Sequence, residues 1–183
     1  MLAGLRPFPT SNALSTRAPA SSVVVIPAHN EETSIAATIA ALSAEAAGIA
    51  DLLVVADNCS DRTAEIAGAS GSRTIVRTDP ALRGKGFALA FARDELSKAP
   101  PAVVLVVDAD CHIDRLSLTA LIDAAANRSV PAQAVNLLRP DLAAAPFVQV
   151  SNFAFMLRNL IRQRGLQRLA GRVHLTGTGM AFP

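Results

Sequence analysis

The sequence contains no tryptophan or tyrosine, and it has only two cysteines among 183 residues. Cys59 and Cys111 show no metal-type spacing, so the sequence offers neither a disulfide scaffold nor a zinc site. We interpret both as free thiols of a reducing compartment, and a disulfide between them stays open. No apolar run approaches the length of a membrane span, and residues 1–21 lack the apolar centre of a secretory signal.

Acidic residues are missing from the last part of the chain. The net charge is only +2, but all 15 Asp and Glu residues lie at or before Asp141. Five arginines follow: Arg158, Arg162, Arg164, Arg168 and Arg172. Two interpretations stay open. The arginines form a surface for an anionic partner, such as phosphate or an anionic membrane, or they are the solvated face of a helix.

The length and the composition, rich in Ala and Val, predict one packed α/β domain over residues 21–183. The preceding residues, 1–20, are expected to form a disordered leader. Short apolar runs predict buried strands at 22–26, closed by Pro27, and at 52–56, 74–77 and 103–107. Helices are expected to open at 30–33 and to span 63–69, 87–97 and 116–126.

This alternation of strands and helices predicts a mostly parallel central sheet flanked by helices. The strand runs are continuously apolar, as expected where helices cover both faces of a sheet. Beyond Asn127 the pattern predicts a strand at 132–138, a helix at 147–163, a short turn at 166–170 and an edge strand at 173–175. Ligands of such sheets bind at the carboxyl ends of the strands, so the polar residues that follow different strands should share one rim.

Two carboxylates, Asp108 and Asp110, follow the apolar run 103–107. Alternate residues of a strand point the same way, so both acids can face one bound cation. Mg²⁺ and Mn²⁺ prefer oxygen ligands and commonly share them with substrate phosphates. The pair therefore predicts a metal–phosphate site. The competing interpretation is that Asp follows a strand because it favours turns.

Other polar residues also follow predicted strands. Asp57 is expected to contact a ligand and Asp61 to cap the next helix, although Asp57 could instead form a local turn. The loop Arg83–Gly86 offers backbone N–H groups and Lys85 to a phosphate. It is not a P-loop, and no GxGxxG motif is present, so a nicotinamide cofactor has little support.

Five segments, taken together and in this order, resemble family 2 glycosyltransferases of the GT-A fold. They are VVVIPAHNEE at 23–32, VVADNCSDRT at 54–63, RGKGFALAFA at 83–92, VVDADC at 106–111 and TGTGMAFP at 176–183. The resemblance implies an inverting transferase that uses a nucleotide-sugar donor, most often UDP-linked, together with Mg²⁺ or Mn²⁺. It also implies a saccharide or lipid-linked acceptor, polysaccharide biosynthesis and a cytoplasmic location, with the cytoplasmic face of a membrane as an option. No nucleic-acid partner is expected.

The resemblance also implies roles for individual residues. Those expected to bind the nucleotide-sugar are Pro27, Ala28, Asn30, Glu31, Asp57, Lys85, Gly86 and Asp108. Asp110, with Asp108, would hold the metal ion. The sugar and acceptor side would be formed by Gly177, Thr178 and Gly179.

One part of the family pattern is missing. The general base of such enzymes belongs to an acidic motif after the glycine-rich loop, and this sequence has no acid past Asp141. We therefore expect a domain truncated at its C-terminal end, which binds donor and metal but transfers sugar poorly or not at all. Two alternatives stay open: a donor-binding or regulatory module, and a sugar-phosphate nucleotidyltransferase. The second is disfavoured because residues 27–31 are not a basic glycine-rich loop.

Overall fold

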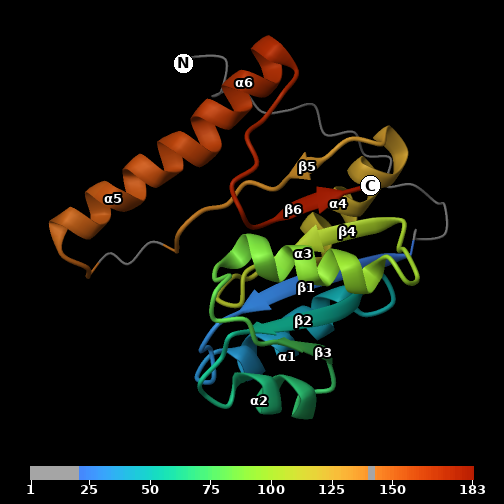
Figure 1. The fold of residues 1–183 in the computed structure, drawn as a ribbon. Helices are drawn as coiled ribbons and strands as arrows, with labels where there is room; N and C mark the ends of the chain where they lie inside the picture. The colour runs from blue at the N-terminus through green and yellow to red at the C-terminus, as the bar shows by residue number, and fades with distance from the viewer. Residues whose placement is uncertain (1–20, 140–142) are drawn as a thin grey trace.

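A six-stranded sheet forms the centre of the computed structural model, which describes residues 21–139 and 143–183 (Figure 1). The predicted leader, residues 1–20, lies outside the described residues. The strands are β1 Ser22–Ala28, β2 Asp51–Asp57, β3 Arg73–Arg77, β4 Val103–Val106, β5 Ala132–Gln133 and β6 Met180–Phe182. Their order in the sheet is β3-β2-β1-β4-β6-β5.

The first four strands are parallel, whereas β6 runs antiparallel to β4 and to β5. The predicted mostly parallel sheet is therefore confirmed. After β1 the chain builds outward through β2 and β3, and it then returns to the other side of β1 with β4. Such a reversal of strand order is the usual place for a ligand crevice in an α/β sheet.

Helices cover both faces of this sheet (Figure 1). The helices α1 Ile35–Ala46, α2 Thr63–Ala69 and α4 Arg115–Arg128 pack on one face, and α3 Lys85–Leu96 packs on the other. The remaining helical segments are α5 Pro146–Met156, the π-helical segment η2 Leu157–Arg162 and α6 Gln163–Ala170. Alternate residues of β1 serve the two faces. Val24 and Ile26 belong to the core under α1, α2 and α4, whereas Val25 packs with Ala88 and Ala92 of α3. The buried apolar runs of the strands thus follow from two covered faces.

The strand β1 continues to Ala28, so the prediction that Pro27 closes it is wrong. The last residue of β4, Val106, pairs with Val25, and beyond that point β1 pairs only with β2 among the described strands. A proline has no N–H to give to a ladder, and it is tolerated where a strand has a neighbour on one side. The polar rim therefore begins after Ala28.

The C-terminal part differs most from the sequence prediction. The strand predicted at 132–138 is limited to Ala132–Gln133, and 173–175 is not a strand. The antiparallel strand is instead Met180–Phe182. The reason lies in a side chain: Gln163 bonds both the N–H of His174, at 2.9 Å, and its carbonyl, at 3.2 Å. The backbone of His174 is therefore already satisfied without a ladder.

The predicted helix at 147–163 and the turn at 166–170 form one continuous helical run, α5–η2–α6. Gly165 does not end it, and Gly171 does, with a left-handed φ of 64°. Figure 1 shows α5 extending away from the sheet. All of α5 is described, and none of its side chains is buried; Phe147 is 81% exposed. No helix in the described ranges has the length and apolar character needed to cross a membrane.

Candidate functional site

A cavity of about 420 Å³ opens at the carboxyl ends of β1, β2 and β4. This is the rim that the sequence predicted. Seven of the predicted site residues line the cavity: Pro27, Ala28, Glu31, Asp57, Lys85, Asp108 and Asp110. The lining also includes polar side chains that the sequence analysis did not assign to a ligand, namely His29, Asn58 and Arg83.

Two of the residues expected to bind the nucleotide-sugar, Asn30 and Gly86, are not among the described lining residues. Asn30 has a left-handed φ of 55°, and its side-chain oxygen accepts a hydrogen bond from the N–H of Ser60 at 2.8 Å. It thereby joins the loop after β1 to the loop after β2. Gly86 is the second residue of α3, next to Lys85.

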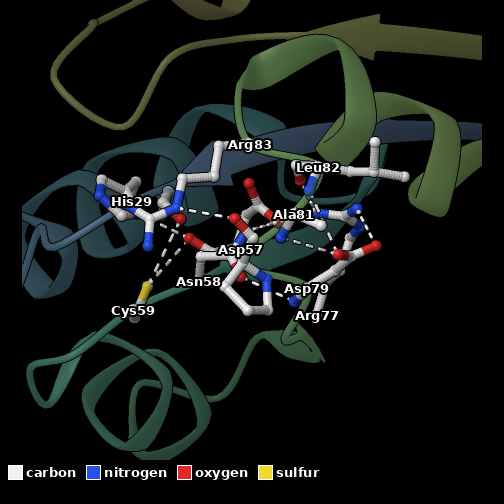
Figure 2. Close-up of polar contacts among 11 residues, drawn as sticks. His29, Asp57, Asn58, Cys59, Arg77, Asp79, Ala81, Leu82 and Arg83 are labelled. Carbon is white, nitrogen blue, oxygen red and sulfur yellow. Dashed lines mark hydrogen bonds and ion pairs between the residues drawn. The ribbon is translucent and has the colours of Figure 1, made fainter.

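Asp57, the last residue of β2, is held by a buried ion pair, which Figure 2 shows. Nη1 of Arg77 donates to Oδ1 of Asp57 at 2.7 Å, and the two side chains are only 10% and 7% exposed. The same guanidinium donates to Asp79 at 3.1 Å and to the carbonyl of Leu82 at 2.8 Å. A charge-assisted bond of this kind fixes the carboxylate in one orientation at the cavity wall.

Asn58 extends this network (Figure 2). Its φ is 51°, a left-handed conformation that Asn adopts more readily than most residues. Its N–H donates to the carbonyl of Arg77 at 2.8 Å, and its side-chain oxygen accepts from the N–H of Asp79 at 2.7 Å. On the other side, Nδ1 of His29 lies 2.7 Å from the carbonyl of Asp57. The loops after β1, β2 and β3 are thus tied together beneath the cavity.

Asp61 and Thr63 connect the start of α2 to Glu31. The hydroxyl of Thr63 accepts from the N–H of Glu31 at 2.7 Å and donates to Asp61 at 2.5 Å. Asp61 also accepts from the N–H of Thr63, although Arg62 is the N-cap residue. Burial raises the pKa of Asp61, but hydrogen bonds from Thr63 and the N–H of Glu32 outweigh it, so the pKa lies below its ordinary value.

Lys85 joins the acidic pair to the glycine-rich loop. As the first residue of α3, it donates from Nζ to Oδ1 of Asp108 and, at 2.5 Å, to the carbonyl of Gly177. The N–H of Asp108 donates to Oγ1 of Thr178 at 3.0 Å. Gly177, Thr178 and Gly179 are not among the described lining residues, but these bonds place their loop directly behind Asp108.

The donor atoms of Asp108, Asp110 and Cys111 all lie within 4.8 Å of one another. Burial raises the pKa of the Cys111 thiol, and the neighbouring carboxylate of Asp110 raises it further. A hydrogen bond with Thr178 lowers this pKa, but the net shift is upward. A protonated thiol is a poor ligand, whereas two carboxylates suit Mg²⁺ or Mn²⁺, which take their remaining ligands from phosphate and water. The side chains therefore fit a hard divalent cation at Asp108 and Asp110.

Arg77 is the residue that sequence reasoning missed. It is the last residue of β3, so the strand-end rule that selected Asp57 and Asp108 applies to it equally. The available signal was a pair of opposite charges at neighbouring strand ends, since Arg77 ends one strand and Asp57 ends the next. Its guanidinium also lies 5.6 Å from the centre of the Phe87 ring, which anchors the start of α3.

The family model described as Glycosyl transferase family 2 matches residues 23–181. The chain belongs to this family. The match spans the three strand ends that build the cavity and the loop Gly177–Gly179, and it confirms the resemblance and the GT-A fold expected from the five sequence segments. No curated protein matches the chain.

Solved structures of glucosyl-3-phosphoglycerate synthase from Mycobacterium tuberculosis are similar to it. One, in complex with Mg²⁺ and UDP, is 25% identical with a TM-score of 0.58, covering 97% of this chain and 61% of that one. A second, with Mn²⁺, UDP-glucose and phosphoglyceric acid, is 24% identical with a TM-score of 0.61 and coverages of 97% and 62%, and it supports the fold alone. A third, with Mn²⁺, UDP-glucose and glycerol 3-phosphate, is 31% identical with a TM-score of 0.50 and coverages of 65% and 45%. The chain thus spans 45% to 62% of the length of these structures.

Proposed function

We propose that this domain is a glycosyltransferase that binds a UDP-linked sugar together with Mg²⁺ or Mn²⁺ in the cavity at the ends of β1, β2 and β4. The observation that carries the proposal is the convergence of Asp57, Lys85, Asp108 and Asp110 on one cavity, in a chain of family 2. Two of the similar synthase structures contain UDP with Mg²⁺ and UDP-glucose with Mn²⁺, respectively, which supports the same donor chemistry here.

The cavity offers each part of such a donor a suitable group. Asp57, fixed by Arg77, accepts a hydrogen bond from the imide N–H of the base. Pro27 and Ala28 border the nucleoside, and Glu31 lies near the ribose. Lys85 and the N-terminus of α3, including Gly86, face the diphosphate, since a helix N-terminus and an ammonium both favour an anion. Asn30 acts on the nucleoside side through the loop that it holds.

In this proposal Asp110 and Asp108 would hold the cation, and a cation bound there would supply Lewis-acid neutralisation of the charge on the leaving diphosphate. Lys85 supplies a second positive charge, and its bonds to Asp108 and to the carbonyl of Gly177 position the ammonium before the donor arrives. Transfer is inverting, with a carboxylate acting as general base on the acceptor hydroxyl. No residue of this chain is assigned to that role.

We assign the acceptor to the side of Gly177, Thr178 and Gly179, and we propose a saccharide or lipid-linked acceptor of polysaccharide biosynthesis. A location at the cytoplasmic face of an anionic membrane is supported by α5 and the arginines that follow it. Phe147, Val150 and Phe153 are 81%, 65% and 57% exposed. The five predicted arginines, from Arg158 to Arg172, lie on η2, on α6 and just beyond α6. Exposed apolar residues beside cations are typical of helices that lie in a membrane interface.

Calorimetric titration of the domain with UDP, with and without Mn²⁺, tests the donor proposal. We expect UDP to bind only in the presence of the metal and with higher affinity than GDP or dTDP. Asp110→Asn should lower the affinity for UDP at least tenfold. Arg93→Ala, on the exposed surface of α3, is the control and should bind as the wild type does. UDP binding that is unaffected by metal would contradict the assigned role of Asp110. Release of UDP from a UDP-sugar in the presence of an acceptor is then measured. A transferase releases UDP in this assay, whereas a donor-binding module does not.

A further inference from the structure

A second cavity, of about 580 Å³, lies between the end of α4, the chain around β5, and the helical run η2–α6. None of the residues that line the donor cavity lines this one. Its remaining wall is the segment 171–176, which leads directly into the loop Gly177–Gly179. The wall of the second cavity therefore continues into the loop whose Gly177 carbonyl accepts from Lys85 of the donor cavity.

Three buried side-chain atoms at this cavity have no hydrogen-bond partner among the described residues. Asn159 is 3% exposed, and both its Oδ1 and its Nδ2 are unpaired. Oγ1 of Thr176, on the opposite wall, is unpaired as well. Burying such groups without partners is costly, so native proteins seldom do so without a ligand or water to bond them.

The backbone around Asn159 is itself unusual. Asn159 belongs to η2, the π-helical segment Leu157–Arg162, and π-helical turns are rare and occur frequently at functional sites. Gln163, directly after η2, uses its side chain to hold the backbone of His174. Gln163 of this helical run thus fixes the wall around His174, whereas the side-chain amide of Asn159 is left unpaired in the cavity.

The charge of the lining is of one sign. Arg128, Arg164 and Arg172 line the cavity, and none of the described lining residues is Asp or Glu. Arg128 and Arg172 form no ion pair with any described residue. Gathered guanidinium groups without carboxylates favour a phosphate, which they bind through two parallel hydrogen bonds.

Hydrogen bonds connect this cavity to the donor site. The side-chain oxygen of Gln133 accepts from the N–H of Thr176 at 2.8 Å, and its nitrogen donates to the carbonyl of Thr178 at 2.8 Å. The carbonyl of Gly177, between these two residues, accepts from Lys85. A ligand bound in this cavity contacts the wall 171–176 and therefore lies beside the loop Gly177–Gly179, to which the sugar and acceptor side was assigned.

We propose that the second cavity binds the phosphate group of the acceptor, held by Arg128, Arg172 and Asn159. The term acceptor rests on the proposed transferase function, whereas the phosphate site rests on the cavity alone. The phosphate is a monoester or diphosphate, and it is carried either by a soluble sugar or polyol phosphate or by a polyprenyl lipid. An acceptor anchored here extends its hydroxyl past Thr176 toward the donor cavity.

The test uses the whole chain without metal and measures binding of inorganic phosphate and glycerol 3-phosphate by calorimetry and by the shift in Tm. We expect Arg128→Ala/Arg172→Ala to weaken phosphate binding at least tenfold. Asn159→Leu should weaken it as well while leaving the Tm of the phosphate-free protein unchanged or raised, since the variant removes unpaired buried polar atoms. Lys85→Ala is included to detect phosphate that binds in the donor cavity instead, and Arg93→Ala, on the exposed surface of α3, is the control that should bind phosphate like the wild type.

The sources of the phosphate are separated by a second arm with phosphatidylcholine vesicles that contain a polyprenyl phosphate. Vesicle binding lost in Arg128→Ala/Arg172→Ala identifies a lipid phosphate, whereas binding of glycerol 3-phosphate alone identifies a soluble one. Phosphate binding that all cavity variants retain, or that Lys85→Ala abolishes, overturns the proposal. Binding of UDP with Mn²⁺ is measured on the same variants. If the wild-type chain does not bind UDP with Mn²⁺, the transferase function is contradicted. If the cavity variants bind UDP as the wild type does, the two sites are distinct.

Discussion

Asp57 and Arg77 lie side by side in the register of two parallel strands, and their side chains meet in a buried ion pair of 2.7 Å. Each is the last residue of its strand. The pair joins the floor of the donor cavity to the chain that leads into α3, because the same guanidinium also bonds Asp79 and the carbonyl of Leu82. A single side chain thus positions both the proposed base-binding carboxylate and the segment that delivers Lys85.

Arg77→Ala should be strongly destabilising, because it leaves the carboxylate of Asp57 buried without its charge partner. Loss of one member of a buried pair costs about 3–5 kcal/mol of unfolding free energy. Urea unfolding measures this cost. The matched control is Arg93→Ala, whose pair with Asp94 is 76% and 66% exposed and should contribute less than about 1 kcal/mol. Equal costs for the two variants would refute the assigned role of Arg77.

Lys85→Met should weaken UDP binding by about tenfold or more, as expected for loss of one charge-assisted bond to phosphate, while affecting folding little. Its side chain is 34% exposed, so the pair with Asp108 contributes little to stability. Titration with uridine, which lacks phosphate, supplies the diagnostic comparison: uridine affinity should not change. The control is Lys98→Met, at an exposed pair with Glu95 near the far end of α3. A parallel loss of uridine affinity would place Lys85 at the nucleoside instead.

The acid side of the stability profile should depend on Asp61. Hydrogen bonds hold its pKa below the ordinary value of 3.8, so its carboxylate stabilises the fold at every pH above the unfolded value. That contribution is lost as the pH falls through the lower pKa of the folded state. Asp61→Asn should therefore lower Tm near neutral pH and give a flatter decline of Tm below about pH 4. If Tm falls with pH in the same way for the variant and the wild type, Asp61 does not contribute to the acid dependence of stability.

The sequence predicted the first part of the fold well because its signals there are local. The apolar runs that became β1 to β4, the acid that ends β2 and the acids that follow β4 could be assigned from neighbouring residues alone. The C-terminal part is set by distant side chains. Gln163 satisfies the backbone of His174, and Gln133 satisfies that of Thr176, across separations of 11 and 43 residues. No local pattern shows such bonds, and for this reason an edge strand was predicted at 173–175, whereas the structure has the antiparallel strand Met180–Phe182.

Gly179 is the position at which this C-terminal segment is bonded to the end of β4, two residues before Asp108. Its N–H donates to the carbonyl of Val106 at 2.8 Å, and its own carbonyl accepts from the N–H of Ala134 at 2.7 Å. Its φ is 64°, and an added Cβ would lie 3.1 Å from Cβ of Ala134. Gly171 has the same φ of 64°, but no atom lies within 4 Å of its added Cβ. The two glycines therefore share the backbone requirement and differ in packing.

Gly171→Ala should cost about 1–2 kcal/mol of unfolding free energy, the price of a left-handed alanine. Gly179→Ala should cost more, because either Ala134 or the end of β4 must also move. A shift of β4 at Val106 is carried two residues on to Asp108, so Gly179→Ala should also weaken UDP binding in the presence of Mn²⁺, whereas Gly171→Ala should not. Urea unfolding and calorimetry of both variants measure the two effects. If both variants lose stability equally and retain donor affinity, the loop 176–179 does not position the acidic pair.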